Sequence, residues 1–261
     1  MKVFVADKVV GVTHLHDVVY IICEECSNMI RFNATTHQRL PGISVKDLRL
    51  PRDIAACERT SQVYVADSTF FGPAYIWRVP SNGAGIERWL LKSQFGEPRT
   101  LSVTSSRLLV MSNSSQLIQF NAAGAELKRI QLPDYMKQPR HAVESPTGTF
   151  IVSHRNFAEQ DDHYHVSEVD SEGEPLRQFS CSPYLPPKSA AYIAVDSQGN
   201  IFVAGPYHIL LLDAQLARCR LIIEKLPCFD PSHERVCYAE HSGQLMIAVD
   251  CDVQVFDVLC P

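Results

Sequence analysis

The stretch AYIAVDSQGNIFVAG, from Ala191 to Gly205, decides the fold of this chain. Two runs of alternating apolar residues flank a polar break, DSQGN, which contains a glycine suited to a tight turn. Two such runs joined by a short polar break are typical of a β-hairpin. If the hairpin recurs along the chain, it specifies a repeat architecture rather than an isolated element.

Similar hairpins do recur. The first core position of each, here called its anchor, is assigned to Gly11, Ile54, Leu101, Ala142, Ile193 and Cys237. Successive anchors are 43, 47, 41, 51 and 44 residues apart. Six units at this period predict an all-β fold, a six-bladed β-propeller of four-stranded antiparallel blades. The expected blades span residues 8–47, 48–94, 95–133, 134–181, 182–227, and 228–261 with 1–7, as one domain over 1–261.

The third strand of most units ends on a short polar residue. These residues are Asn33, Asn121, Asp170, Asp213 and Asp257, while the second unit has Pro80 in this place. Asn and Asp side chains bond the backbone of the turn that follows them, so we interpret these residues as structural. After Asp257 only VLCP remains, which is too short for a fourth strand. We therefore expect the N-terminal strand, Val3–Ala6, to join the last blade and close the ring.

Composition narrows the functional classes. The chain has 261 residues, of which 46% are hydrophobic and 20% charged, and a formal net charge of −5. This acidic balance disfavours bulk attraction to nucleic acid or an anionic membrane, and no apolar run is long enough to cross a bilayer. Nine scattered cysteines, several within apolar runs, indicate reduced, mostly buried thiols and a cytoplasmic protein. The lone pair in CEEC (Cys23, Cys26) is weak evidence for zinc, so we expect neither a metal nor a cofactor.

Two segments carry a family resemblance. The unit IAVDSQGNIFVA (Ile193–Ala204) and the unit PRDIA…VYVADS (Pro51–Ser68) resemble the NHL repeat. The resemblance covers nearly the whole chain, although other units are degenerate. The chain is similar to the C-terminal propeller of tripartite-motif proteins. This sequence lacks the RING, B-box and coiled coil that precede the propeller in those proteins. The resemblance implies a propeller that binds protein or structured RNA on its top face, the face where the first strands begin.

Four arginines share one position, two residues before an anchor. They are Arg52, Arg99, Arg140 and Arg235. We expect their guanidinium groups to surround the mouth of the central channel on the top face. Crowded like charges need acidic partners or a bound anion. The arginines therefore either pair with acids of neighbouring blades or bind an acidic peptide, a phosphorylated peptide or an RNA backbone.

Two blades carry longer connections between their second and third strands, on the same face. In blade two the segment STFFGPAY places Phe70 and Phe71 beside a Gly-Pro pair. They form either an exposed apolar tip that binds protein or a tip folded back over the blade. In blade four the segment HRNFAEQDDHYH contains His154, His163 and His165. His163 and His165 are spaced as a metal pair on a strand, but we favour a solvated, pH-sensitive loop.

An enzyme is the less favoured hypothesis. Apart from Glu144, the positions one and two residues after the anchors offer no strong oxygen ligand for a metal. Asp53 and His141 are candidates for an acid–base pair across the mouth, as in a propeller hydrolase or lyase. We predict instead an intracellular interaction scaffold, a monomer whose top face binds a protein or acidic peptide, with RNA binding by the same face as the alternative.

Overall fold

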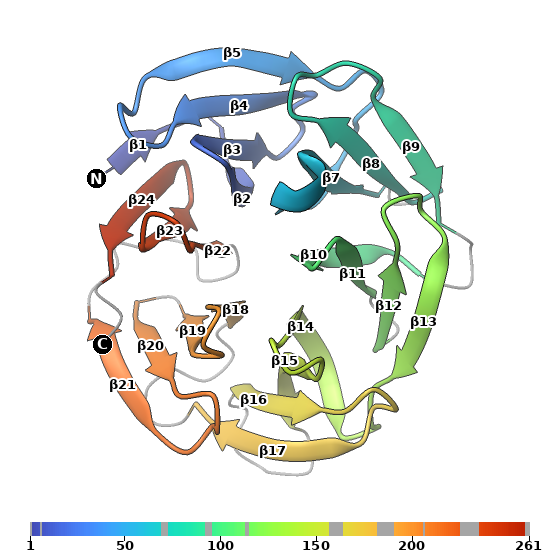
Figure 1. Cartoon of the computed structure of the whole chain (residues 1–261), viewed down its shortest axis with the longest axis vertical. Helices are drawn as coiled ribbons and strands as arrows, with labels where there is room; N and C mark the ends of the chain where they lie inside the picture. Colours follow the sequence, from blue (N-terminus) through green and yellow to red (C-terminus); the bar gives the residue numbers. More distant parts are fainter. Residues whose placement is uncertain are drawn as a thin grey trace.

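The structure is a computed structural model that describes residues 2–5, 7–68, 73–91, 96–112, 115–156, 164–181, 191–205, 207–224 and 235–258. Within these ranges the strands form six four-stranded antiparallel sheets, which stand as blades around a central channel (Figure 1). One 3-10 helix, η1 (Glu58–Thr60), lies in the turn between β6 and β7. The predicted six-bladed β-propeller is confirmed.

Each blade runs from an inner first strand to an outer fourth strand (Figure 1). Blade one contains β2 (Val9–Leu15), β3 (Val18–Cys23), β4 (Asn28–Asn33) and β5 (Arg39–Ser44), and blade two contains β6 (Pro51–Cys57), β7 (Gln62–Asp67), β8 (Tyr75–Pro80) and β9 (Glu87–Leu90). Blade three contains β10 (Pro98–Thr104), β11 (Arg107–Ser112), β12 (Gln116–Phe120) and β13 (Glu126–Gln131), and blade four contains β14 (Met136–Glu144), β15 (Phe150–Asn156), β16 (Tyr164–Val169) and β17 (Pro175–Ser180). Blade five contains β18 (Tyr192–Val195), β19 (Ile201–Ala204), β20 (Ile209–Leu212) and β21 (Cys219–Ile223), and blade six contains β22 (Arg235–Ala239), β23 (Gln244–Val249), β24 (Asp252–Asp257) and β1 (Lys2–Phe4).

The hairpin of blade five shows how the local sequence makes a turn. The Oδ1 atom of Asp196 accepts hydrogen bonds from the backbone N–H groups of Gln198 (3.0 Å) and Asn200 (2.7 Å). Gly199 has φ of +87°, a conformation in which a side chain would be strained. The Asx residues at the ends of third strands act similarly. In Asn33, Asn121, Asp170 and Asp213, Oδ1 accepts backbone N–H groups of the following turn.

The ring closes as predicted. Strand β1 pairs with β24 in antiparallel register, with Lys2 opposite Gln254, Val3 opposite Val253 and Phe4 opposite Asp252. The backbone N–H of Val5 also donates to the carbonyl of Cys251, at 2.8 Å. The outer edge of the last blade is therefore covered by the other end of the same chain, on the left of Figure 1.

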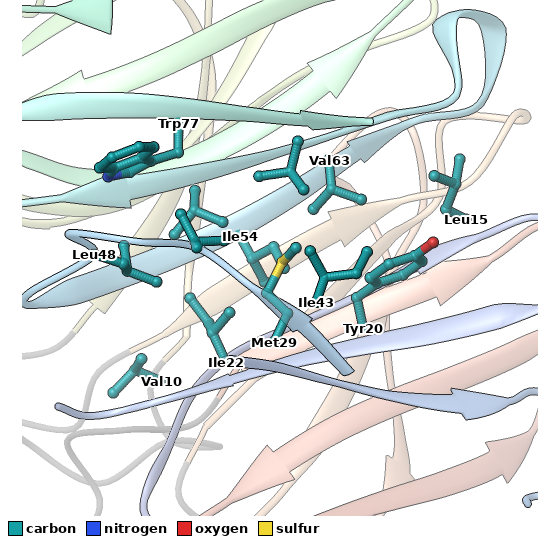
Figure 2. Packing of buried hydrophobic residues seen from close by; sticks show 13 residues of the cluster. Val10, Leu15, Tyr20, Ile22, Met29, Ile43, Leu48, Ile54, Val63 and Trp77 are labelled. Atoms are coloured by element: carbon teal, nitrogen blue, oxygen red, sulfur yellow. The ribbon is translucent and has the colours of Figure 1, made fainter. Parts of the chain in front are cut away.

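The core consists of six hydrophobic clusters, and each lies between two neighbouring blades. Figure 2 shows the cluster between blades one and two, where Ile54 of β6 lies close to Ile22 of β3 and Met29 of β4. Alternating strand residues supply these clusters because both faces of a blade are packed against a neighbour.

Strand register corrects two of the anchors. A buried aliphatic residue stands at the centre of each second strand: Ile21, Val65, Val110, Val152, Val203 and Ile247. Its partners on the first strands are Val12, Ile54, Leu101, Ala142, Ile193 and Val236. The anchors of blades one and six are thus Val12 and Val236, not Gly11 and Cys237. The turn between the first two strands differs in length from blade to blade, so spacing along the sequence does not determine this register.

Candidate functional site

The residues just before the corrected anchors form what we call the mouth ring. Its members are Gly11, Asp53, Thr100, His141, Tyr192 and Arg235. The ring lies at the end of the channel where the first strands begin. The channel holds a cavity of about 260 Å³, and Asp53, His141, Tyr192 and Arg235 are among the residues that line it. Asp53, His141, Tyr192 and Arg235 thus bring polar groups together at this end of the channel.

Asp53 is buried and bonded to two blades. Its Oδ1 accepts the backbone N–H of Ile54 at 2.9 Å, and its Oδ2 accepts the N–H of Leu101, in blade three, at 2.9 Å. Burial raises the pKa of this carboxyl to about 6, and the nearby Arg235 and these hydrogen bonds oppose the rise. The carboxylate therefore joins blades two and three.

His141 joins the next pair of blades. Its Nε2 lies 3.4 Å from the carbonyl of Leu101, and its ring lies 5.6 Å from that of Tyr192 in blade five. Burial, and next the charge of Arg235, lower the pKa of the imidazole to about 4, so it is neutral at pH 7. Asp53 and His141, predicted as a possible acid–base pair, each contact the main chain of Leu101.

Arg235 is a member of the mouth ring, and this differs from the sequence prediction. We expected it to occupy the same position as Arg52, Arg99 and Arg140, two residues before an anchor. The corrected anchor of blade six is Val236, so Arg235 directly precedes it and belongs to the mouth ring. Its side chain is only 12% exposed, and its guanidinium lies 4.0 Å above the ring of Tyr192. Its Nε is 3.5 Å from Oδ1 of Asp53. The prediction failed because ten residues separate Val236 from its partner Ile247, against nine between Ile193 and Val203 in blade five, and the spacing of the repeat does not show this difference.

The other three arginines, which we call the rim arginines, precede the mouth ring by one residue. The pairing of first and second strands shifts at this point in blades two, three and four. Arg99 is exposed, whereas Arg52 and Arg140 are half-buried. Arg52 Nε donates to Ser68 Oγ at 2.9 Å, and Arg140 lies 5.6 Å from the ring of Tyr192. The rim arginines thus occupy one arc of the mouth, in three consecutive blades.

The predicted binding loops are only partly described. Phe70, Phe71 and His163 lie outside the described residues. His154 and His165 are described, and the expectation of a solvated loop was wrong for both. His154 lies in β15 and His165 lies opposite it in β16, and their side chains are 0% and 1% exposed. The two strands extend further into the polar segment than its composition suggests, because neighbouring blades bury this face.

The buried histidine pair is held by specific contacts. The rings of His154 and His165 are stacked, with centroids 5.9 Å apart. His154 Nδ1 lies 2.9 Å from the carbonyl of Arg155 and Nε2 lies 2.8 Å from Ser167 Oγ. Because Nδ1 faces a carbonyl, Nδ1–H donates and Nε2 accepts, which satisfies the neutral ring. Burial lowers the pKa of His154 to about 4.

The opposite end of the channel is lined by acidic residues. Glu58, Glu144 and Glu240 are among the lining residues. Glu144 is buried, pairs with Arg107, and accepts a hydrogen bond from Gln119 Nε2 at 2.8 Å. The sequence pattern pointed to Glu144 but not to the other two, which belong to the turns after the first strands. Glu58 and Glu240 lie at different distances from the anchors that the sequence assigned to their blades, so the repeat pattern does not single them out.

The thiols and potential metal ligands show a simple pattern. The seven described cysteines are unpaired, and three of them are buried. Cys26 Sγ lies 3.3 Å from Oδ2 of Asp7, which acts as its acceptor. Among the described residues, no group of three or more His, Cys, Asp or Glu side chains is placed to hold a metal ion. No helix in the described ranges has the length and apolar character needed to span a membrane.

Comparison with known proteins places the chain by its fold. No protein-family model and no curated protein sequence matches it. Among solved structures, a chain of Kuenenia stuttgartiensis hydrazine synthase is similar with a TM-score of 0.69 and 12% identity, over 100% of this chain and 98% of that one. The WD40 propeller domain of Doa1 gives 0.64 and 13%, over 98% and 95%. A chain of the Mitotic Checkpoint Complex gives 0.68 and 10%, over 100% and 91%. The shared feature is the β-propeller. At these identities the likeness concerns the fold alone.

Proposed function

We propose that this propeller is a protein-interaction module whose partner presents an acidic segment to the rim arginines. The observation that carries the proposal is the repetition of arginine at one structural position in blades two, three and four. Three guanidinium groups thereby lie along one arc of the channel mouth, in a chain whose net charge is −5. Guanidinium groups bind carboxylates in a forked geometry that point charges do not provide. A neighbour in fold belongs to a Mitotic Checkpoint Complex, and this use of a propeller in an assembly supports the proposal.

The finer features of the proposal follow from the sequence. We propose that the blades are NHL repeats and that the protein works as a non-enzymatic monomer in the cytoplasm. The Asp196 and Gly199 turn gives the DxxGN pattern a structural reason. Unpaired thiols at all seven described cysteines support a reducing compartment. Phe70, Phe71 and His163 remain candidate contacts on the sequence pattern alone, whereas burial removes His154 and His165 from direct contact with a partner.

The test compares two triple variants that lose the same charge. One carries Arg52→Ala, Arg99→Ala and Arg140→Ala. The matched control carries Arg39→Ala, Arg59→Ala and Arg218→Ala, three exposed arginines away from the mouth. Both are first checked for wild-type circular dichroism and thermal unfolding, and Arg235 is left unchanged because its contacts are structural.

Binding is measured by fluorescence anisotropy with a labelled poly-glutamate peptide and a labelled oligouridine, at several salt concentrations. We expect the rim variant to lose peptide binding and the control to keep it. Equal binding by both variants contradicts the rim as the site. Tight oligouridine binding with a steep salt dependence, lost in the rim variant, replaces the proposal with RNA binding.

A further inference from the structure

The seam between blades six and one depends on non-covalent contacts. At every other junction the polypeptide runs directly from an outer strand to the next inner strand. At the seam, the chain reaches blade one from β1, and among the described residues β1 is held to β24 by three residue pairs. Two further backbone bonds, Val5 N–H to Cys251 O (2.8 Å) and Val9 N–H to Asp250 O (2.7 Å), reinforce it. A strand pair of this length is weak by itself.

Arg235 crosses this seam. It belongs to β22 in blade six, yet it makes polar contacts with blade two. Its Nη2 donates to the carbonyl of Arg52 at 3.1 Å, and its Nε lies 3.5 Å from Oδ1 of Asp53. Tyr192 of blade five supports the guanidinium from one face. The side chain therefore links blades five, six and two across the channel mouth.

Blade one contributes no side chain to the mouth ring. Gly11 is the member of the mouth ring in blade one. A Cβ atom there would lie 2.7 Å from Ile54 Cγ2 and 3.1 Å from the backbone nitrogen of Ile54. Ile54 is itself packed in the cluster between blades one and two (Figure 2). Strand β2 thus approaches β6 closely, and Arg235 reaches the start of the same β6 strand.

We propose that Arg235 is a latch that holds the ring closed across its seam, in parallel with the pairing of β1 and β24. Two closures in parallel support each other. Loss of one leaves the seam shut, and the hydrophobic cluster between blades six and one stays buried. Loss of both lets the seam open and exposes that cluster, so the two losses together exceed the product of their separate effects.

The test is a double-mutant cycle in the full-length chain. Val5→Pro removes the N–H that bonds Cys251 and weakens the strand closure. Arg235→Ala removes the latch. The matched control replaces Arg235→Ala with Arg99→Ala, which removes an exposed arginine from the same face. Opening is followed by hydrogen exchange of peptides from blades one and six, with peptides from blades three and four as the internal reference.

We expect Arg235→Ala alone to speed exchange in blade one by less than about threefold, because the pairing of β1 and β24 still holds the seam shut. In the Val5→Pro, Arg235→Ala double variant the increase in exchange rate should exceed the product of the two single increases. In the control cycle with Arg99→Ala, the increase in the double variant should equal that product within about twofold. A product within twofold for the Arg235 cycle overturns the latch. So does an equal loss of protection in blades three and four.

A second variant keeps the test decisive if Arg235→Ala does not fold. Arg235→Lys keeps a positive charge near Asp53 but lacks the fork that reaches both Asp53 and the Arg52 carbonyl. In the same cycle with Arg235→Lys, the increase in exchange rate of the double variant should again exceed the product of the single increases, but by a smaller factor. Multiplicative behaviour in this cycle also overturns the latch.

Discussion

Acid should destabilise this protein through its buried neutral histidines, and His154 is the sharpest case. Its ring is completely buried and both nitrogens are satisfied in the neutral form. Its pKa is lowered from 6.5 to about 4. In the unfolded chain the same ring takes up a proton near pH 6.5. Between these values the unfolded state binds more protons, so the free energy of unfolding falls as pH falls.

The size of the effect follows from the shift. A difference of about 2.5 pKa units corresponds to about 3 kcal/mol. This stability is fully present above pH 6.5 and is lost as pH falls through about 4. His141 acts in the same direction, because its pKa is also lowered to about 4. Asp53 acts oppositely: its pKa is raised to about 6, so its contribution is present at low pH and is lost as pH rises through 6.

The assay is urea unfolding at pH 7.5, 6.5, 5.5 and 4.5 for wild type and His154→Gln. Glutamine can bond Ser167 but does not titrate. We expect the variant to be less stable at pH 7.5, yet to lose roughly half as much stability as wild type on acidification. His37→Asn, at an exposed turn position with φ of +59° that asparagine tolerates, serves as the control. An acid-induced loss in His154→Gln equal to that of wild type refutes the reasoning.

Three further predictions concern stability and use chemical unfolding followed by tryptophan fluorescence or circular dichroism. Gly11→Ala should cost about 1–3 kcal/mol or more, because its Cβ would overlap Ile54; a neutral effect would mean that β2 shifts freely. Asp67→Asn should cost about 1–3 kcal/mol and change the emission of Trp77, whose Nε1 donates to Asp67 Oδ2 at 3.0 Å; unchanged emission would contradict this contact. Asp196→Ala should cost about 1–2 kcal/mol, because two backbone N–H groups lose their acceptor, and wild-type stability would show that the turn forms without it.

The features that were predictable from sequence are local ones. The DSQGN turn was recognisable because Asp196 and Gly199 act on the backbone within five residues. The Asx residues at third-strand ends were recognisable for the same reason. The closing strand was predictable by counting, since the last unit lacks a fourth strand and the first has one to spare. The two turn inferences depend on residues near one another in the chain, and the closure depends only on the number of strands in each unit.

The features that were missed depend on contacts between blades. Arg235 appeared equivalent to Arg52, Arg99 and Arg140 because the hairpin of blade six is one residue longer than that of blade five, which the spacing of the repeat does not show. His154 and His165 appeared solvated because their segment is polar, but the neighbouring blades cover them. The sequence pattern of one repeat does not show which of its residues the neighbouring blade buries.

The sequence by itself therefore determined the architecture. The six hairpin repeats and their turn chemistry arise from short-range backbone preferences and alternating hydrophobicity, and the closure of the ring follows from the number of strands in each repeat. Only the tertiary structure decided which polar residues face the channel, which arginines lie on its rim, and that a side chain of blade six reaches blade two. Those outcomes depend on register and burial between blades, where a shift of one residue moves a side chain from one surface to the other.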